Sequence, residues 1–479
     1  MLFNSGGFLI FLLVVFALYW TGRSRQWQNC ILLLASYIFY AFWDWRFLGL
    51  VMLSSFLCWG CGIQIGKYRE SSPGKAKLFN IINIVSNLGI LCYFKYYNFF
   101  AQSFANLFLG GDSDDLLLNM ILPVGISFYT FKALCYTIEI WRGNITAERN
   151  PVILFVYVGF FPQLLAGPIA RPNSLIPQLS AKREFAYEDG VQGLRQILWG
   201  LFKKVVVAGN CALYVNQIWS DYCSQSGSTL LVAAILYCFQ IYGDFSGYSD
   251  MSVGIGKLFG IGSDLNFRTP YFSRNISEFW RRWHISLTSW FRDYVYIPMG
   301  GSRCSSGRVI FNTFIVFLLS GLWHGANWTF VMWGAYNAVL FVPGLLMGNR
   351  RRKFKDTVAM GRAFPNLKEL ARMVATFVLV MFGWIIFRAD NLEQTFRYFT
   401  TMLSFRTVGM PMMYKIREVM CPALIGAVIV ILVEWKNRFN SNNVLYINNR
   451  LLRWLAYCTL VYCLFRFSGG SSDFIYFQF

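Results

Sequence analysis

The chain consists of long apolar segments separated by short polar segments that are mostly basic. A helix needs about 20 mostly apolar residues to cross the ~30 Å hydrocarbon core of a bilayer, because lipid offers the backbone no hydrogen-bond partner. On this criterion the pattern predicts an all-α polytopic membrane protein with about 11 transmembrane helices. The predicted spans are Met1–Gly22, Gln26–Trp43, Phe47–Gly66, Leu78–Phe94, Asn150–Ala170, Val205–Ser220, Tyr222–Gly243, a pair within Val309–Asn349, and the shorter Met373–Phe387, Pro422–Val433 and Leu455–Phe465.

Two apolar segments are interrupted by helix breakers. Pro123 and Gly125 break the segment Leu116–Trp141, and Phe161–Pro177 contains several prolines. Irregular backbone survives at membrane depth only where protein buries it or a wet cavity accepts its hydrogen bonds. The breaks therefore predict re-entrant segments and a polar cavity.

A basic stretch over about residues 268–308 is also rich in aromatic residues. Helical spacing relates Trp280, Trp283, His284, Leu287, Phe291 and Tyr294. Because Arg281, Arg282 and Arg292 lie elsewhere on the same helical wheel, we expect an amphipathic helix at the cytoplasmic interface of the membrane. A helix hairpin over about residues 309–349, which carries His324, is expected to follow it.

The composition supports the membrane interpretation. Hydrophobic residues make up 56% of the chain and charged residues 14%, whereas soluble domains carry about 25% charged residues. No internal repeat, low-complexity tract or soluble domain interrupts the pattern. We therefore expect residues 1–479 to form a single membrane domain.

The formal charge of +20 raises the possibility of nucleic-acid binding. The basic residues flank the apolar segments, however, where they orient a membrane protein and attract anionic headgroups. The expected partner is therefore the lipid bilayer and not nucleic acid.

Basic residues in short loops stay in the cytoplasm, and this rule predicts the topology. Arg23 and Arg25 follow the first apolar segment, which has no basic residue before it, so we interpret it as a retained helix with its N-terminus outside. The same rule places Lys67–Lys77 and Arg350–Lys355 inside and the acidic loop Asp112–Asp115 outside.

The 12 cysteines are scattered singly apart from a C-x-x-C pair at Cys58 and Cys61. Such a pair is either a redox motif or, within a membrane span, two small apolar residues. Its position inside a predicted span favours the second interpretation.

The chain contains only 2 histidines, His284 and His324. This excludes an H-E-x-x-H zinc site and any site that needs three imidazoles from one chain. The sequence also lacks a G-x-S-x-G elbow, a P-loop and a G-x-G-x-x-G turn. The common hydrolase, ATPase and dinucleotide-dependent classes therefore lose support, and we expect no metal and no organic cofactor.

His324 lies in Ser320-Gly-Leu-Trp-His-Gly-Ala-Asn327, within a run that has no acidic or basic residue. An imidazole at membrane depth must find partners or bear its desolvation cost, so it is a functional candidate. Gly321 and Gly325 leave room for a substrate or for another backbone. Helix packing is the structural alternative.

His284 has weaker support when taken alone, because a hydrogen-bonded histidine on an interfacial helix is common.

Asp244 and Asp250 close another apolar segment. Six residues apart on a helix, they face directions roughly 120° apart and do not form one acid–base pair. We expect them to pair with nearby arginines.

Several ordered segments together are similar to the membrane-bound O-acyltransferase superfamily, and especially to its bacterial alginate O-acetyltransferase branch. They are Phe161-Pro-Gln-Leu-Leu-Ala-Gly-Pro168, Gln240–Asp250, Phe279–Tyr294, Ser320–Gly325 and the terminal Phe474–Phe479. Gly243 and Asn337 are departures, and the second stands where many relatives have a further histidine.

The resemblance implies transmembrane and re-entrant helices around a central tunnel, with an acyl donor entering from the cytoplasm and an acceptor hydroxyl from the other side. By match to the motifs, His324 takes the catalytic position and His284 the second histidine position. The D-alanyl branch, which loads teichoic acids, resembles Phe161–Pro168 less closely, so acetyl transfer is favoured.

The resulting hypothesis is an O-acyltransferase of the bacterial inner membrane that uses a cytoplasmic thioester such as acetyl-CoA. The acceptor is a hydroxyl of an exported polysaccharide, or of an extracytoplasmic acyltransferase partner that relays the acyl group. His324 is the expected general base, and His284 is expected to orient the donor or to stabilise charge on the thioester oxygen. Arg281, Arg282 and Arg292 would attract an anionic donor or, alternatively, lipid headgroups. The remaining donor or tunnel candidates are Trp283, Trp323, Asn327 and Ser320.

Two alternatives stay open at this point. One is transfer of D-alanyl or another acyl group from a carrier protein to an envelope polymer. The other is a polysaccharide transporter or scaffold without chemistry of its own.

Overall fold

The computed structural model describes residues 2–110, 116–346, 357–404, 411–413, 415–439 and 445–468, without the side chains of residues 416 and 417. The predicted loops Asp112–Asp115 and Arg350–Lys355 and the terminal motif Phe474–Phe479 lie outside these residues.

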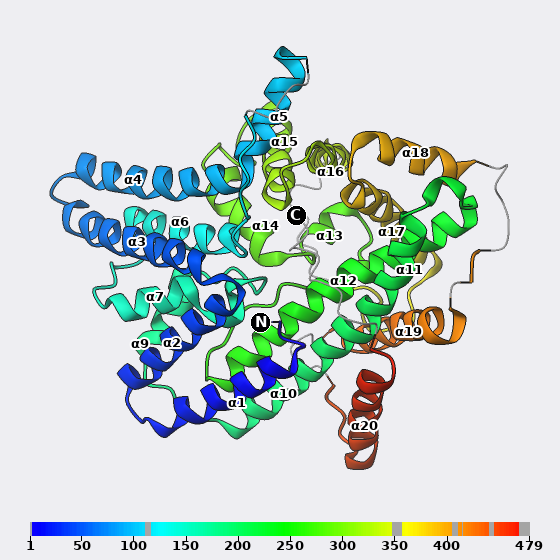
Figure 1. Ribbon diagram of the computed structural model, residues 1–479, viewed down its shortest axis with the longest axis horizontal. Helices are drawn as coiled ribbons and strands as arrows, with labels where there is room; N and C mark the ends of the chain where they lie inside the picture. Colours follow the sequence, from blue (N-terminus) through cyan, green and yellow to red (C-terminus); the bar gives the residue numbers. More distant parts are fainter. Residues whose placement is uncertain are drawn as a thin grey trace. The chain divides into compact units, whose positions relative to one another are not determined.

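Every regular element among the described residues is a helix, which confirms the predicted all-α class (Figure 1). The described chain forms two compact units, one of Met1–Leu194 with Ser252–Asp264 and one of Arg195–Met251 with Leu265–Phe479. The first unit contains α1 (Gly6–Thr21), α2 (Arg25–Asp44), η1 (Trp45–Phe47), α3 (Leu48–Tyr68), α4 (Pro73–Leu91), η2 (Cys92–Tyr96), α5 (Tyr97–Phe108), α6 (Ile126–Arg142), α7 (Pro151–Gly159), α8 (Phe161–Leu164), α9 (Pro172–Ser180) and the start of α10 (Tyr187–Leu201).

The second unit holds the remaining helices, apart from the last residues of α12. They are η3 (Phe202–Ala208), α11 (Gly209–Trp219), η4 (Tyr222–Ser224), α12 (Gly227–Leu258), η5 (Pro270–Phe272), α13 (Ile276–Trp280), α14 (Ile285–Phe291), η6 (Arg292–Tyr296), α15 (Ser306–His324), α16 (Trp328–Leu346), α17 (Leu367–Arg388), α18 (Leu392–Leu403), η9 (Ile416–Met420), α19 (Cys421–Lys436) and α20 (Arg450–Arg466).

Among the described residues, 8 helical stretches are long and apolar enough to cross a membrane. They are Arg25–Tyr68, Pro73–Phe108, Tyr187–Trp219, Gly227–Leu258, Ser306–His324, Trp328–Leu346, Leu367–Arg388 and Glu418–Lys436. The first stretch holds two of the predicted spans, α2 and α3, joined by a short turn. The predicted span Asn150–Ala170 is wrong, because the chain there forms the short helices α7 and α8 with a break at Phe160.

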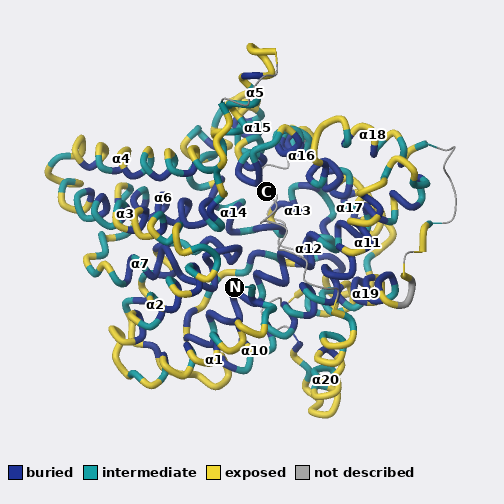
Figure 2. The backbone as a smooth tube through the Cα atoms, viewed as in Figure 1, coloured by how far each residue is buried: buried dark blue, intermediate teal, exposed yellow. Residues whose placement is uncertain are grey.

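In the first unit, α4 shows the arrangement expected in lipid, with α3 and α6 beside it (Figure 1). Its buried face carries Asn80, Asn83 and Asn87, while apolar residues such as Val85 are exposed, Val85 by 62%. Figure 2 shows exposed positions recurring along α4. The Asn83 amide donates to the Thr137 hydroxyl at 2.8 Å. Polar side chains therefore bond inside the unit and the apolar surface is left for lipid.

The interrupted segments of the first unit enclose a buried polar cluster. Gly125 has a positive φ of 77° and directly precedes α6, so the predicted break falls at a helix start. The Lys132 ammonium on α6 donates to the Tyr157 carbonyl and the Gln163 amide oxygen, each at 3.3 Å. A Cβ at position 167 would meet Ser252 Oγ at 2.4 Å, so glycine is needed for this packing.

In the second unit, α10 and η3 pack against α12 through glycine. A Cβ at Gly200 would lie 2.5 Å from the Gly247 carbonyl oxygen, and one at Gly243 would lie 2.9 Å from that of Lys203. The backbones therefore touch, which accounts for a small residue at position 243.

Because the backbones approach closely, two lysines of η3 form ion pairs with carboxylates of α12. Lys203 pairs with Asp250 at 2.6 Å, and Lys204 pairs with Asp244. The prediction that arginines neutralise the two aspartates is wrong, because the wide π-helical turn η3 directs two consecutive lysines at α12.

Candidate active site

The predicted amphipathic helix over Trp280–Tyr294 is wrong, because it is broken into α13 and α14. The break ends at His284, whose backbone lies in the left-handed region with φ 42° and ψ 55°. Arg281 to His284 include no proline or glycine to signal the break. Tertiary contacts therefore hold this conformation, which is costly for a residue with a β-carbon.

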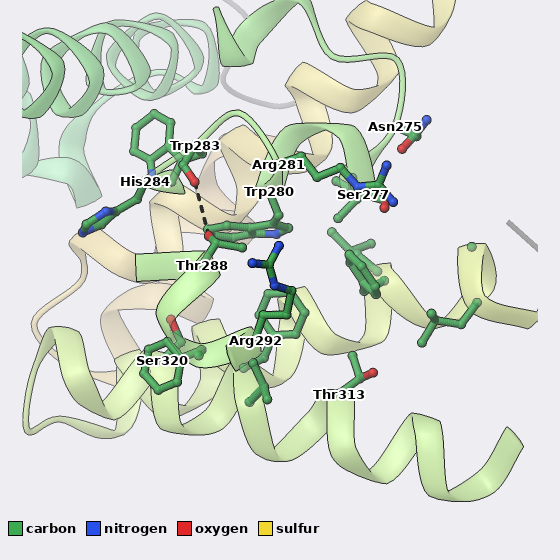
Figure 3. Close-up of a pocket in the computed structure, with 18 of the residues that line it drawn as sticks. Asn275, Ser277, Trp280, Arg281, Trp283, His284, Thr288, Arg292, Thr313 and Ser320 are labelled. Carbon is green, nitrogen blue, oxygen red and sulfur yellow. Dashed lines mark hydrogen bonds between the residues drawn. The ribbon is translucent and has the colours of Figure 1, made fainter. Parts of the chain in front are cut away.

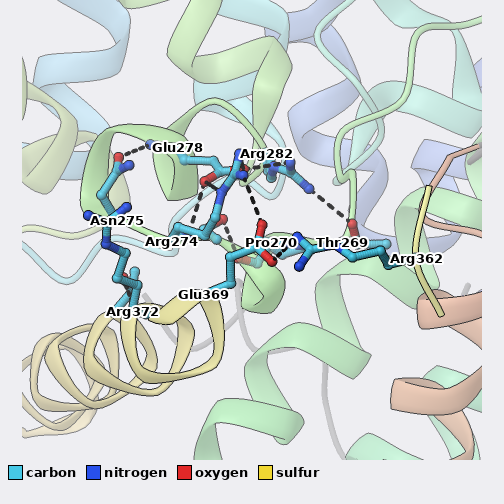
Figure 4. Close-up of polar contacts among 11 residues, drawn as sticks. Thr269, Pro270, Arg274, Asn275, Glu278, Arg282, Arg362, Glu369 and Arg372 are labelled. Carbon is cyan, nitrogen blue, oxygen red and sulfur yellow. Dashed lines mark hydrogen bonds and ion pairs between the residues drawn. The ribbon is translucent and has the colours of Figure 1, made fainter. Parts of the chain in front are cut away.

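A buried carboxylate anchors the turn before His284. Glu278 on α13, 2% exposed, binds the Arg282 guanidinium at 2.6 Å and that of Arg274 at 3.1 Å. Figure 4 shows both guanidinium groups converging on Glu278, with Arg282 also donating to the Thr269 hydroxyl at 3.3 Å. Arg274 lies 3.7 Å from Glu369 at the start of α17. The network ties α13 to the neighbouring helix.

The His284 imidazole is 1% exposed, and neither ring nitrogen has a hydrogen-bond partner among the described residues. It lies edge-on to Phe245 and Trp323, with ring centroids 4.6 and 5.8 Å away. Burial lowers the pKa of His284 to about 3, so the ring is neutral at physiological pH. A neutral, buried imidazole with unused nitrogens is suited to bind a polar ligand atom.

His324 is the last residue of α15 and is 5% exposed. Its ring contacts Trp323, Trp333 and Phe387, with centroids 5.0 to 5.3 Å away. Since Trp323 also contacts His284, one indole lies against both imidazoles.

Glycines around His324 allow α15 and α16 to approach closely. A Cβ at Gly321 would meet the Phe330 carbonyl oxygen at 2.2 Å, and one at Gly325 would meet the Phe330 ring at 2.1 Å. These two glycines therefore make room for a neighbouring residue of the hairpin.

A cavity of about 850 Å³ in the second unit is lined by both histidines, together with residues of α13 to α17. Ser320, Thr288, Thr313 and Thr376 contribute hydroxyl groups, and Trp280, Phe317, Phe341 and other apolar side chains form much of the wall. In the view of Figure 3, His284 lies at one end of the labelled residues and Asn275 at the other, with Arg281 and Arg292 between them.

The formally charged residues that line the cavity within the described chain are all arginines. Arg274, Arg281, Arg292 and Arg372 line it, whereas its lining within the described chain contains no aspartate or glutamate. Arg274 is neutralised by the Glu278 network and Arg292 pairs with Asp293 at 2.7 Å. The exposed Arg372 side chain forms no ion pair with any described residue. The cavity therefore favours an anionic ligand.

The structure brings most of the predicted site residues together and gives the others different surroundings. His284, His324, Trp283, Arg281, Arg292 and Ser320 line the cavity. Arg282 belongs to the Glu278 network, and Trp323 lies against both histidine rings. The Asn327 amide donates to the Asp390 carbonyl oxygen at 2.7 Å and its side-chain oxygen accepts from the Thr329 amide, so it caps α16.

Sequence reasoning missed Arg274 and Arg372. Arg372 has the sequence appearance of a basic residue that flanks a span, and no local pattern separates it from Lys368 on the same helix. Asn337, a departure from the family pattern, donates to the Trp333 carbonyl oxygen one turn earlier on α16. Among the described residues, no group of three or more His, Cys, Asp or Glu is arranged to hold a metal ion.

Comparison with known proteins identifies the family of this chain. Residues 82–385 match the model of the membrane-bound O-acyltransferase family. The chain is 38% identical over 410 residues to the probable alginate O-acetylase AlgI of Pseudomonas aeruginosa, covering 85% of this chain and 76% of the relative. It is 31% identical to the peptidoglycan O-acetyltransferase of Helicobacter pylori, over 100% of this chain and 98% of the relative.

A more distant relative is the teichoic acid D-alanyltransferase of Bacillus subtilis, 30% identical over 56% of this chain and 69% of the relative. The region 82–385 that matches the family model includes both histidines and every described residue that lines the cavity. The chain therefore belongs to the membrane-bound O-acyltransferase family, and it is an acyltransferase.

Proposed function

We propose that the cavity is an active site that transfers an acetyl group from a thioester to a hydroxyl of a cell-envelope polysaccharide or of an acyl-relaying partner protein. The observation that carries this proposal is that the chain's two histidines, distant in sequence, line one cavity. Family membership removes the support for a transporter or a scaffold without chemistry.

In the proposed reaction, His324 is the general base. It accepts the proton of the acceptor hydroxyl while the hydroxyl oxygen forms a bond to the thioester carbonyl carbon. The carbon–sulfur bond then breaks, and the proton passes from His324 to the leaving thiolate. A positioned general base contributes about 10²–10⁴-fold to the rate of such a step.

His284 has a supporting role in the proposal. Its neutral ring has one N–H donor, and both ring nitrogens are available for a ligand. Donation to the thioester oxygen would stabilise the negative charge that develops on the tetrahedral intermediate. Ser320, which also lines the cavity, provides a further hydroxyl donor.

The arginines support an anionic donor such as acetyl-CoA. Arg281, Arg292 and Arg372 line the cavity and would attract phosphate groups, and a flexible thioester arm would extend from them toward the histidines. The proposal needs no metal or organic cofactor, because the activated acyl group arrives on its carrier.

The acid-free lining favours acetyl over D-alanyl. A D-alanyl thioester carries an ammonium group beside its carbonyl, and no carboxylate among the described lining residues would neutralise it. An acetyl group has no charge to neutralise. The cavity chemistry therefore agrees with the closer similarity to relatives named as O-acetylases.

The named relatives also support the acceptor class. Two are named for O-acetylation of alginate or peptidoglycan, and these acceptors are carbohydrate polymers. We therefore propose that the acceptor is an exported polysaccharide. We also propose that the protein lies in the bacterial inner membrane with its N-terminus outside, and that the thioester enters from the cytoplasm. The topology rests on the basic loops and is tested by cysteine accessibility from each side of the membrane.

The test of the base assignment is His324→Ala, with Glu393→Gln on the exposed surface of α18 as a control. We expect His324→Ala to reach normal membrane levels and to lose at least about 100-fold in thioester consumption and acetylated polymer. The control variant Glu393→Gln should keep normal thioester consumption and a normal amount of acetylated polymer. Full acetylation by His324→Ala would refute the proposal.

A further inference from the structure

The left-handed backbone of His284 is unusual for a residue with a side chain. With φ 42° and ψ 55°, the β-carbon crowds the following carbonyl, so the surrounding structure must stabilise this conformation. The sequence from Trp280 to Tyr294 has the spacing of one continuous helix. A helix without this kink is therefore the competing conformation.

A neighbouring segment bonds to the backbone on both sides of His284. The Arg268 N–H donates to the Arg282 carbonyl at 3.0 Å, and the Ile285 N–H donates to the Asn266 carbonyl at 2.9 Å. We call residues 266–268 the His284 clamp. In a continuous helix the Ile285 N–H would instead bind a carbonyl four residues earlier in its own helix, so this bond is specific to the kink.

The Asn266 side chain adds a third contact at the same place. Its oxygen accepts from the Ser286 hydroxyl at 2.6 Å and from the Ser286 N–H at 3.4 Å. Asn266 is 1% exposed, and its amide nitrogen has no partner among the described residues. A buried asparagine with an unused donor is costly for stability alone, which favours a role in the site.

The kink determines where the imidazole points. In Figure 3 the side chains of Trp283 and His284, although adjacent in sequence, leave the turn in different directions. Trp283 packs against Trp384 at 4.8 Å, whereas His284 lies edge-on to Trp323 beside the cavity. Relaxation to a helix would move the imidazole away from this position.

We propose that Asn266 is a positioning residue, which holds His284 in its left-handed conformation through the His284 clamp. This inference rests on the proposed function, because it assigns Asn266 an effect on the reaction only through the His284 imidazole. Asn266 itself does not line the cavity within the described chain.

The test is a double-mutant cycle of Asn266→Leu with His284→Ala, measured as thioester turnover of purified full-length protein. Alone, Asn266→Leu should lower kcat about 10- to 100-fold with donor KM within about threefold, because a small displacement of a catalytic group has this effect. In the His284→Ala background, Asn266→Leu should change the residual kcat less than about twofold. An equal loss in both backgrounds would overturn the proposal.

The matched control is Asn210→Leu. Asn210 is also 1% exposed and lies in the same unit, where its amide donates to the Val206 and Phe467 carbonyls at 2.7 and 2.8 Å. We expect a similar loss of thermal stability from it without loss of kcat. A comparable fall of kcat in this control would assign the Asn266 effect to general destabilisation and overturn the proposal.

Asn266→Asp keeps a side-chain acceptor for Ser286 and should recover part of the kcat that Asn266→Leu loses; no recovery would overturn the role of that acceptor. If Asn266→Leu does not fold, Asn266→Ser replaces it in the cycle, with the same outcomes. Failure of the two proposals is distinguishable, since an active His324→Ala contradicts the proposed function. An inactive His324→Ala with full kcat in Asn266→Leu contradicts the clamp alone.

Discussion

Two polar regions of the second unit differ in whether their buried polar groups have partners. One is the lysine cluster, formed by Lys203, Lys204, Asp244 and Asp250 with the hydrogen-bonded pair Tyr242 and Glu434. Every charge named there has an opposite charge or a hydrogen-bond partner. The other is the histidine cavity, where the His284 nitrogens have none among the described residues and the lining has arginines but no carboxylates.

This difference distinguishes buried polar groups that stabilise the fold from buried polar groups that can bind a ligand. Fully paired buried charges hold helices in register and have no capacity left for a ligand. Unused buried donors cost free energy until a ligand satisfies them. We therefore expect changes in the lysine cluster to reduce stability and changes in the cavity to reduce turnover.

The largest expected effect is on stability, from Lys204→Met. The change removes the ammonium that neutralises Asp244, and breaking a buried pair in this way costs about 3–5 kcal/mol. Thermal denaturation in detergent and the yield of folded membrane protein measure it. The double variant Lys204→Met with Asp244→Leu should recover much of the loss, because an apolar pair leaves no charge buried. Wild-type stability in the single variant would contradict the comparison.

A smaller effect, and on turnover alone, is expected from His284→Asn. Asparagine tolerates the left-handed conformation, so thermal stability should stay within about 1 kcal/mol of the wild type. It lacks the imidazole, and kcat should fall about 100-fold, as for other lost transition-state donors. Thermal denaturation and thioester turnover are measured on the same preparation. A large loss of stability with normal kcat per folded molecule would place His284 with the lysine cluster.

The smallest effect is expected from Arg372→Gln at the cavity. Its guanidinium is exposed and outside any described ion pair, so stability should not change measurably. Donor KM should rise several-fold, more at low than at high salt, with kcat nearly constant. Lys368→Gln on the same helix, away from the cavity lining, is the control. Equal KM values for both variants would indicate that the positive charge serves the lipid surface.

The sequence allowed the helical class to be predicted, because apolar length is a local signal. An imidazole within an uncharged run is also a local signal, and it made His324 a candidate, whereas His284 was singled out mainly by the family resemblance; the structure places both in the lining of one cavity. The break before His284 could not be predicted, since Asn266 and Arg268 impose it from another segment. The lysine partners of Asp244 and Asp250 were missed for a related reason. A π-helical turn changes the direction of consecutive side chains, and helical spacing assumes that no such turn is present.

The hairpin of α15 and α16 limits how the cavity can change shape. Gly321 faces the Phe330 carbonyl, and Gly334 faces that of Phe317, where a Cβ would lie only 2.4 Å away. Interlocked in this way, the two helices cannot slide or separate without losing contacts between backbones. His324 therefore lies on a rigid pair of helices, and we expect any widening that admits a substrate to involve other elements of the lining, such as α13 and α14, which are only 5 and 7 residues long.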